Sequence, residues 1–195
     1  MGGLAEDIAA VEAAVAKISG DAVVVGHSYG GMVITGASYG ANVRTLVYLA
    51  AFMPVEGASL VSHFPPDALP PFVDRRPDGS VGFVRNFARV ALYGDLDAAA
   101  ADAATDRLVL HSVAAIATPV SRCAWRSTPS TYIVCSEDRI IPPEVQRGMA
   151  ANAAEMRTLS ASHSPMLSRP DELAALLADI AGTGRMPASA SPAMA

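Results

Sequence analysis

A glycine-rich turn between a buried strand and a helix constrains this chain most. Val23, Val24 and Val25 form an apolar, β-branched run, and Gly26-His27-Ser28-Tyr29-Gly30-Gly31 follows it directly. That run is typical of a strand buried on both faces of a parallel sheet. Gly-Xaa-Ser-Xaa-Gly between a strand and a helix predicts a strained turn that exposes the hydroxyl of Ser28. We expect side chains at positions 26 and 30 to collide with neighbouring backbone, which would explain both glycines.

The same turn has the features of a site for a nucleophilic serine. It places Ser28 at the N-terminus of a helix, whose partial positive charge favours a developing oxyanion. The backbone N–H of Tyr29 is the candidate donor to that oxyanion. The alternative is a glycine-rich turn in which Ser28 only caps the helix. A serine hydroxyl is a weak nucleophile until a base removes its proton, so a histidine and an acid are needed elsewhere in the chain.

The position of the histidine follows from chain order. In sheets of this kind the order is serine, then Asp or Glu, then histidine. His163 satisfies this order, because it lies in a loop directly after the last expected strand. His27 is too close to Ser28 in sequence to act as its base. His63 and His111 lie in a proline-rich loop and in an insertion, where we expect solvated or structural roles.

The acid is expected at the end of the strand that precedes the histidine. Ser136-Glu137-Asp138-Arg139 comes directly after a third apolar strand. We prefer Asp138 as the group that orients His163 and stabilises its imidazolium form. Spacing alone does not separate Asp138 from Glu137. Glu56, which follows the second strand, is the next candidate.

The expected elements alternate between strands and helices, which predicts an α/β fold with a parallel sheet of about four strands. Strands are expected at 21–25, 43–52, 131–135 and 156–159, and helices at 4–18, 32–38, 98–110, 142–154 and 168–180. Asp97 should cap the helix that begins at Ala98. The spacing of Phe83, Phe87 and Val90 predicts the buried face of another helix. Residues 1–182 form one domain with a cap insertion at about 54–126, residues 54–82 are expected to be loop, and 183–195 a disordered tail.

Composition excludes several classes of protein. Of the 195 residues, 51% are hydrophobic and 17% charged, which excludes disorder for most of the chain. The net charge of −5 and the lack of a basic stripe argue against nucleic acid as a partner. The longest apolar run, Leu46 to Met53, is too short to cross a membrane. Residues 1–12 do not resemble a signal peptide, so we expect a cytoplasmic protein, and no motif calls for a metal or another cofactor.

Four stretches carry a resemblance to a known family, namely Val23–Thr35, Leu46–Pro54, Pro129–Gln146 and Ser162–Pro170. They resemble the α/β-hydrolase superfamily, in particular the branch of plant methyl-ester esterases and hydroxynitrile lyases with their bacterial relatives. The resemblance implies an α/β-hydrolase fold with a helical cap. It also implies a catalytic triad of Ser28, Asp138 and His163. The implied activity is hydrolysis of a small carboxylic ester through an acyl-enzyme intermediate.

One position separates the two activities of that branch. Its hydroxynitrile lyases carry a lysine directly after the catalytic histidine, which handles the cyanide leaving group. This chain has Ser164 there, and Lys17 is its only lysine. Ester hydrolysis is therefore favoured, with a hydroxynitrile lyase and a non-catalytic remnant or binding protein as alternatives.

The resemblance also shows a departure at the N-terminus. Family members carry further strands before this point and a His-Gly loop that supplies a second oxyanion donor, but this chain contains no His-Gly dipeptide. We therefore interpret the chain as N-terminally truncated, at a cost of about 10²–10³ in rate for a lost donor. The strand at 22–25 would become an exposed apolar edge, which favours a homodimer. The aromatic residues of the insertion would line an apolar pocket or pack in a core: Phe64, Phe72, Phe83, Phe87 and Trp125.

Overall fold

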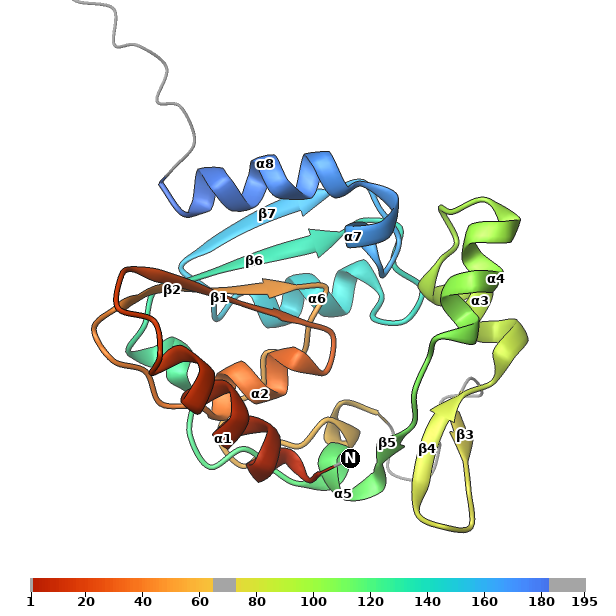
Figure 1. Cartoon of the computed structure of the whole chain (residues 1–195), viewed down its shortest axis with the longest axis horizontal. Helices are drawn as coiled ribbons and strands as arrows, with labels where there is room; N and C mark the ends of the chain where they lie inside the picture. The colour runs from red at the N-terminus through yellow and green to blue at the C-terminus, as the bar shows by residue number, and fades with distance from the viewer. Residues whose placement is uncertain (1, 65–72, 183–195) are drawn as a thin grey trace, which may run out of the picture.

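The centre of the molecule is a sheet of four parallel strands in the order β1-β2-β6-β7, as expected from the sequence (Figure 1). The computed structural model describes residues 2–64 and 73–182. The strands are β1 (Ala22–His27), β2 (Val43–Leu49), β6 (Ser130–Cys135) and β7 (Glu155–Leu159). Because all four strands are parallel, their carboxyl ends lie at one edge, where open α/β sheets place their sites.

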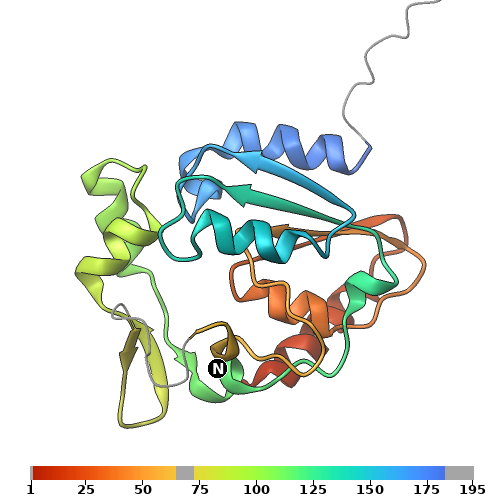
Figure 2. The same ribbon diagram turned by 180° about the vertical axis from the view of Figure 1, so that it is seen from behind.

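Helices cover both faces of this sheet (Figures 1 and 2). On one face lie α1 (Leu4–Val15), α2 (Gly30–Gly36) and α6 (Pro143–Ala150). On the other lies α8 (Pro170–Ile180), which the short helix α7 (Pro165–Ser168) precedes. Alternate residues of β2 point to opposite faces, as the period of a strand requires. Leu46 and Tyr48 pack with α2, whereas Val47 and Leu49 pack toward Leu173 of α8.

Several elements end earlier than the sequence indicates. The second strand was expected to reach Phe52 but ends at Leu49, because Ala50 has a φ of 42° and leaves the extended conformation. The first helix ends at Val15, and α6 ends at Ala150. These differences leave the order of the elements unchanged.

The insertion between β2 and β6 contains more regular structure than expected. The expectation of loop over 54–82 is wrong where β3 (Val73–Arg75) and β4 (Ser80–Phe83) pair antiparallel, and β5 (His111–Ser112) joins them. Short strands with little alternation give a weak signal in a sequence. The helical elements of the insertion are η1 (Val61–His63), α3 (Arg85–Leu92), α4 (Ala98–Asp106), α5 (Val113–Ala117) and η2 (Ala124–Arg126). Asp97 caps α4 as predicted, because its side chain accepts a 2.8 Å hydrogen bond from Ala100 N–H.

The predicted buried face of α3 is wrong. Phe83 ends β4 instead of lying in the helix, and Phe87 and Val90 are 37% and 46% exposed. Small side chains face the core instead, among them Ala88 and Ala91. The helix therefore buries Ala88, Ala91 and Leu92 and leaves Phe87 and Val90 at the surface.

One edge of the described sheet is apolar. Within the described residues β1 pairs only with β2, and Val25 is 41% exposed. None of the described helices has the length and apolar character needed to cross a membrane. The expected tail at 183–195 and Phe72 lie outside the described residues.

Candidate active site

Ser28 occupies a strained turn between β1 and α2. Its φ is 54°, a left-handed conformation that residues other than glycine rarely adopt. Two backbone hydrogen bonds tie the turn to the end of β2: Ser28 N–H donates to Leu49 O at 3.3 Å, and Phe52 N–H donates to Ser28 O at 3.1 Å. The surrounding sheet thus holds a conformation that the serine alone would not favour.

Two glycines of the turn are required by space, but not the two that were predicted. A Cβ at Gly26 would lie 2.7 Å from Gly30 O, as expected. A Cβ at Gly30 would meet open space, so that half of the expectation is wrong. Gly31 has the tighter position, because its Cβ would lie 2.0 Å from Phe52 O. The close approach of α2 to the chain after β2 therefore depends on Gly31.

The side chain of Tyr29 contacts α1 through a hydrogen bond to Asp7. Its hydroxyl donates a 2.7 Å hydrogen bond to Asp7 Oδ2, and its ring meets His111 edge-on at 5.1 Å between centroids. Burial and the hydrogen bond to Asp7 raise the pKa of Tyr29. Its backbone N–H makes no hydrogen bond within the described part of the chain, so it can serve as a donor to an oxyanion.

His163 and Asp138 form a buried pair. Nδ1 of His163 lies 2.7 Å from Oδ2 of Asp138, and the two residues are 1% and 4% exposed. Because a carboxylate only accepts, Nδ1 carries the proton of this hydrogen bond. That assigns the lone pair of neutral His163 to Nε2, the nitrogen that can take a proton from a nucleophile.

The carboxylate of Asp138 is fixed by further donors. Its Oδ1 accepts from the N–H groups of Ile140 and Ile141 at 2.7 and 3.0 Å. Its Oδ2 also accepts from Nε2 of Gln146 at 2.8 Å. Gln146 is fully buried, and its Oε1 in turn accepts from Cys135 N–H at 3.0 Å. Gln146 was not predicted from the sequence, although its place one turn into the helix after the acid was a usable signal.

His27 brings the loop of His163 next to Ser28. Nε2 of His27 lies 2.7 Å from the backbone oxygen of His163, and the two imidazole centroids are 4.8 Å apart. Since a carbonyl accepts, Nε2 of His27 is the donor. Burial, and then the charge of His163, lower the pKa of His27 to about 3. His27 is therefore neutral near pH 7. Because His27 directly precedes Ser28, its hydrogen bond brings the loop of His163 close to the turn of Ser28.

The last contact of the expected triad is open. Nε2 of His163 is buried and makes no hydrogen bond to any described residue, the hydroxyl of Ser28 included. In enzymes without substrate this contact is commonly long and tightens when the substrate binds. The arrangement therefore brings together Asp138 and His163, and His163 contacts His27, the residue before Ser28, but forms no hydrogen bond with Ser28 itself.

The other candidates have different partners. Glu137 accepts from the hydroxyl of Ser160 at 2.8 Å, and Glu56 lies 3.7 Å from Arg126. His63 contacts Ser59 O at 3.0 Å through Nδ1. His111 lines the same cavity as Ser28, a position that was not expected from the sequence. Among the described residues, no cluster of three His, Cys, Asp or Glu side chains could hold a metal ion.

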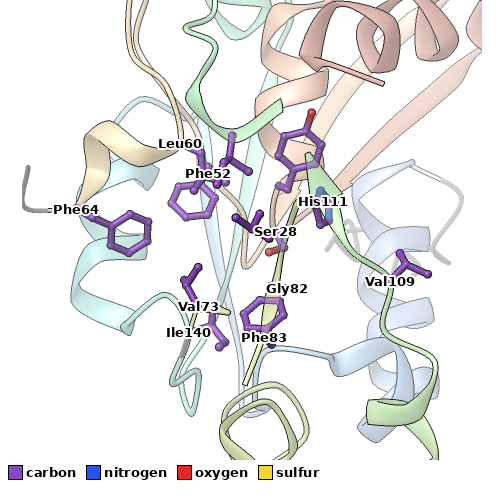
Figure 3. A pocket seen from close by; sticks show the side chains of 13 residues that line it. Ser28, Phe52, Leu60, Phe64, Val73, Gly82, Phe83, Val109, His111 and Ile140 are labelled. Carbon is purple, nitrogen blue, oxygen red and sulfur yellow. The ribbon is translucent and has the colours of Figure 1, made fainter. Parts of the chain in front are cut away.

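An apolar cavity of about 120 Å³ opens at Ser28 (Figure 3). Side chains from the sheet end and from the insertion surround it, among them Phe52, Phe64, Phe83, Ile116 and Ile140. Of the aromatic residues proposed for such a pocket, Phe64 and Phe83 line it. Phe87 and Trp125 do not, and Trp125 donates instead to Pro54 O at 3.0 Å.

Known proteins resemble this chain over most of its length. A sequence model described as "Alpha/beta hydrolase family" matches residues 2–176. Alpha/beta hydrolase nvfD of Aspergillus novofumigatus is 31% identical over 194 residues, which cover 91% of this chain and 78% of the relative. Methylesterase 7 of Arabidopsis thaliana is 29% identical, over 82% of this chain and 68% of its own length. The fold is similar to the crystal structure of a pyrethroid hydrolase from Sphingobium faniae JZ-2, with a TM-score of 0.72, 21% identity, and 93% and 79% of the two chains covered.

Proposed function

This chain belongs to the alpha/beta hydrolase family, and from the geometry of its site we propose that it hydrolyses small carboxylic esters through an acyl-enzyme intermediate. The observation that carries the proposal is the buried pair of His163 and Asp138. Nε2 of His163 has no hydrogen-bond partner among the described residues, and the backbone of His163 is bound by His27, the residue before Ser28. In this proposal Ser28 is the nucleophile, His163 the base, and Asp138 the group that orients the base.

In the first half of the proposed reaction, Oγ of Ser28 attacks the carbonyl carbon of the ester, and Nε2 of His163 takes the hydroxyl proton. The negative charge of the tetrahedral intermediate lies on the former carbonyl oxygen, where Tyr29 N–H donates to it. The bond between the carbonyl carbon and the alcohol oxygen then breaks. His163 gives its proton to the leaving alcohol, and an acyl-Ser28 ester remains.

In the second half, water replaces the alcohol. His163 takes a proton from the water as its oxygen attacks the acyl carbon, and a second tetrahedral intermediate forms. Its collapse breaks the bond to Ser28 Oγ, which recovers the proton from His163. The products are one carboxylic acid and one alcohol, and the enzyme returns to its starting state. Asp138 stabilises the imidazolium in both halves without changing its own protonation.

The cavity supports a substrate with one compact apolar group. Its walls are mostly aliphatic and aromatic, and its volume of about 120 Å³ limits the size of that group. Among the relatives are proteins named as a pyrethroid hydrolase and a methylesterase, names that agree with ester substrates. We propose that the acyl or the alcohol part of the ester fills this cavity while its carbonyl lies at Ser28.

The proposal is tested by turnover of p-nitrophenyl esters by the wild type and by Ser28→Ala. We expect the variant to lose a factor of about 10⁴–10⁶ in kcat, since the acyl-enzyme cannot form. Ser127→Ala is the matched control, because this serine donates to Ala124 O away from the cavity and should keep wild-type turnover. Equal turnover by Ser28→Ala and the wild type would exclude the proposed mechanism.

A homodimer through β1 is a separate proposal. The outer side of β1 pairs with no strand of the described chain, and Val25 of this strand is exposed. Apolar edge strands pair readily with a second copy of the same strand. Light scattering after size exclusion should give twice the chain mass for the wild type and the chain mass for Val25→Lys. A wild-type monomer would contradict the proposal.

A further inference from the structure

The loop that carries His163 is anchored from outside its own element. After β7 ends at Leu159, residues 160–164 form neither a helix nor a strand, yet His163 is almost completely buried. Glu137 N–H donates to Ala161 O at 3.0 Å, which secures the start of the loop. The residue directly before His163 is Ser162, whose contacts reach the insertion.

Ser162 donates to Asp95 from both its backbone N–H and its hydroxyl, and the hydroxyl also lies 3.4 Å from Leu92 O. Ser162 N–H donates to Oδ2 of Asp95 at 2.9 Å, and the hydroxyl of Ser162 donates to Oδ1. Asp95 lies in the turn between α3 and α4, 67 residues before Ser162. Figure 1 shows this turn beyond the carboxyl ends of β6 and β7, where α7 and the loop of His163 lie. One carboxylate therefore connects the insertion to the residue next to the proposed base.

The carboxylate of Asp95 serves as a hydrogen-bond acceptor. Within the described residues it forms no ion pair, whereas Asp102 and Asp106 of the same insertion pair with Arg89 and Arg85. Burial by itself would raise the pKa of Asp95, but hydrogen bonds to its carboxylate from Ser162, Ser168 and its own backbone together lower it. Asp95 is thus ionised near neutral pH. Hydrogen bonds to an ionised acceptor are roughly twice as strong as neutral ones.

We propose that Asp95 is a positioning residue for the reaction, which acts through Ser162 to hold His163 in register with Asp138 and Ser28. The inference rests on the proposed function, because it assigns His163 the role of base. Asp95 touches neither the substrate nor the reacting atoms. Displacement of a catalytic group by about 1 Å can cost a factor of 10² in rate, so the loop needs such an anchor.

The test compares Asp95→Ala with Asp97→Ala. Both variants remove a carboxylate from the same turn region, but Asp97 only caps α4 and does not contact the loop of His163. We expect Asp95→Ala to lower kcat on a p-nitrophenyl ester on the order of 10-fold to 100-fold with little change in KM. Asp97→Ala should keep kcat within about twofold of the wild type. Asp95→Asn retains an oxygen for Ser162 N–H and should recover part of the loss.

A second measurement does not depend on turnover. Hydrogen–deuterium exchange of the peptides that contain residues 160–164 should become faster in Asp95→Ala and stay unchanged in Asp97→Ala. If Asp95→Ala does not fold, Ser162→Ala removes one of the two hydrogen bonds in its place and should show a smaller effect in the same direction.

The outcomes separate this inference from the proposed function. Wild-type turnover with unchanged kcat in Asp95→Ala would overturn the positioning role and leave the esterase proposal intact. Unchanged exchange in the loop would overturn it as well. A wild type without esterase activity would overturn the proposed function, and faster exchange in Asp95→Ala would then show a structural contact only.

Discussion

The central sheet and the insertion differ in how completely they bury their apolar side chains. All six residues of β6 are buried, with apolar neighbours on both faces of the sheet. In the insertion, Phe87, Val90 and Val109 remain exposed, and the buried face of α3 consists largely of alanine. The proposed nucleophile, acid and base lie at the ends of β1, β6 and β7, whereas the insertion supplies much of the cavity wall. The proposed catalytic groups thus come from the sheet, and most of the residues around the cavity come from the insertion.

The largest loss of kcat is expected from a substitution at Asp138. Asp138→Asn should lower kcat by about 10⁴, because an amide can favour the wrong tautomer of His163. Steady-state kinetics on a p-nitrophenyl ester measure the loss. The neighbouring carboxylate provides the control: Glu137→Gln alters only a contact with Ser160 and should keep kcat within a few-fold of the wild type. A similar loss in both variants would contradict the assignment of Asp138.

The next effect concerns the stability of the sheet end. Gly31→Ala places a Cβ against the backbone oxygen of Phe52, which cannot move without displacing the chain after β2. We expect the free energy of unfolding to fall by about 1–3 kcal/mol, as for other overpacked sites. Urea denaturation measures the change. Gly30→Ala is the matched control, since its Cβ meets open space and the variant should be close to the wild type in stability.

The third effect concerns the dependence of stability on pH. The ordinary pKa of histidine is near 6.5, and burial in the fold lowers that of His27 to about 3. Between these values the unfolded chain binds a proton that the folded chain excludes. The free energy of unfolding therefore falls as the pH decreases from 6.5 toward 3, by at most about 1.4 kcal/mol per pH unit from this residue.

His27→Gln tests this effect, because glutamine keeps an N–H donor but does not titrate. The difference in stability between wild type and variant should be constant above pH 7 and should shift in favour of the variant below pH 6.5. Chemical denaturation at a series of pH values measures it. A difference that stays constant down to pH 4 would show that His27 is not held neutral by the fold.

The smallest effect is expected in the insertion. Phe83→Ala enlarges the cavity, whose lining includes neither Asp138 nor His163. The ratio of kcat/KM for p-nitrophenyl hexanoate to that for the acetate should change by about tenfold, in line with other apolar pockets. Turnover of the acetate should stay within a few-fold of the wild type. Loss of turnover of both esters would contradict the proposal that Phe83 only lines the cavity and takes no part in the chemistry.

The sequence predicted the parts of the molecule that depend on local patterns. The parallel sheet and the family are confirmed, because buried β-branched runs and the turn around Ser28 each give a signal within a few residues. The assignment of Asp138 and His163 as catalytic residues stays a prediction, supported by their 2.7 Å contact. Chain order was informative there because parallel strands bring their carboxyl ends to one edge.

The parts that could not be predicted depend on contacts between distant residues. Asp95 and Ser162 are 67 positions apart, and nothing in either local sequence indicates that they meet. The clash that requires glycine at position 31 comes from Phe52, on another segment, so the sequence suggested Gly30 instead. The stripe through Phe87 and Val90 had the correct helical spacing, but tertiary packing placed alanine toward the core.

We propose Ser28 as a nucleophile that His163 and Asp138 activate. The most direct measurement is labelling of the purified protein with a fluorophosphonate, followed by intact mass and peptide mapping, with Ser28→Ala alongside. We expect one adduct on the wild type, located on Ser28, and none on the variant. A folded wild-type protein that remains unlabelled, or an adduct on another residue, would contradict it.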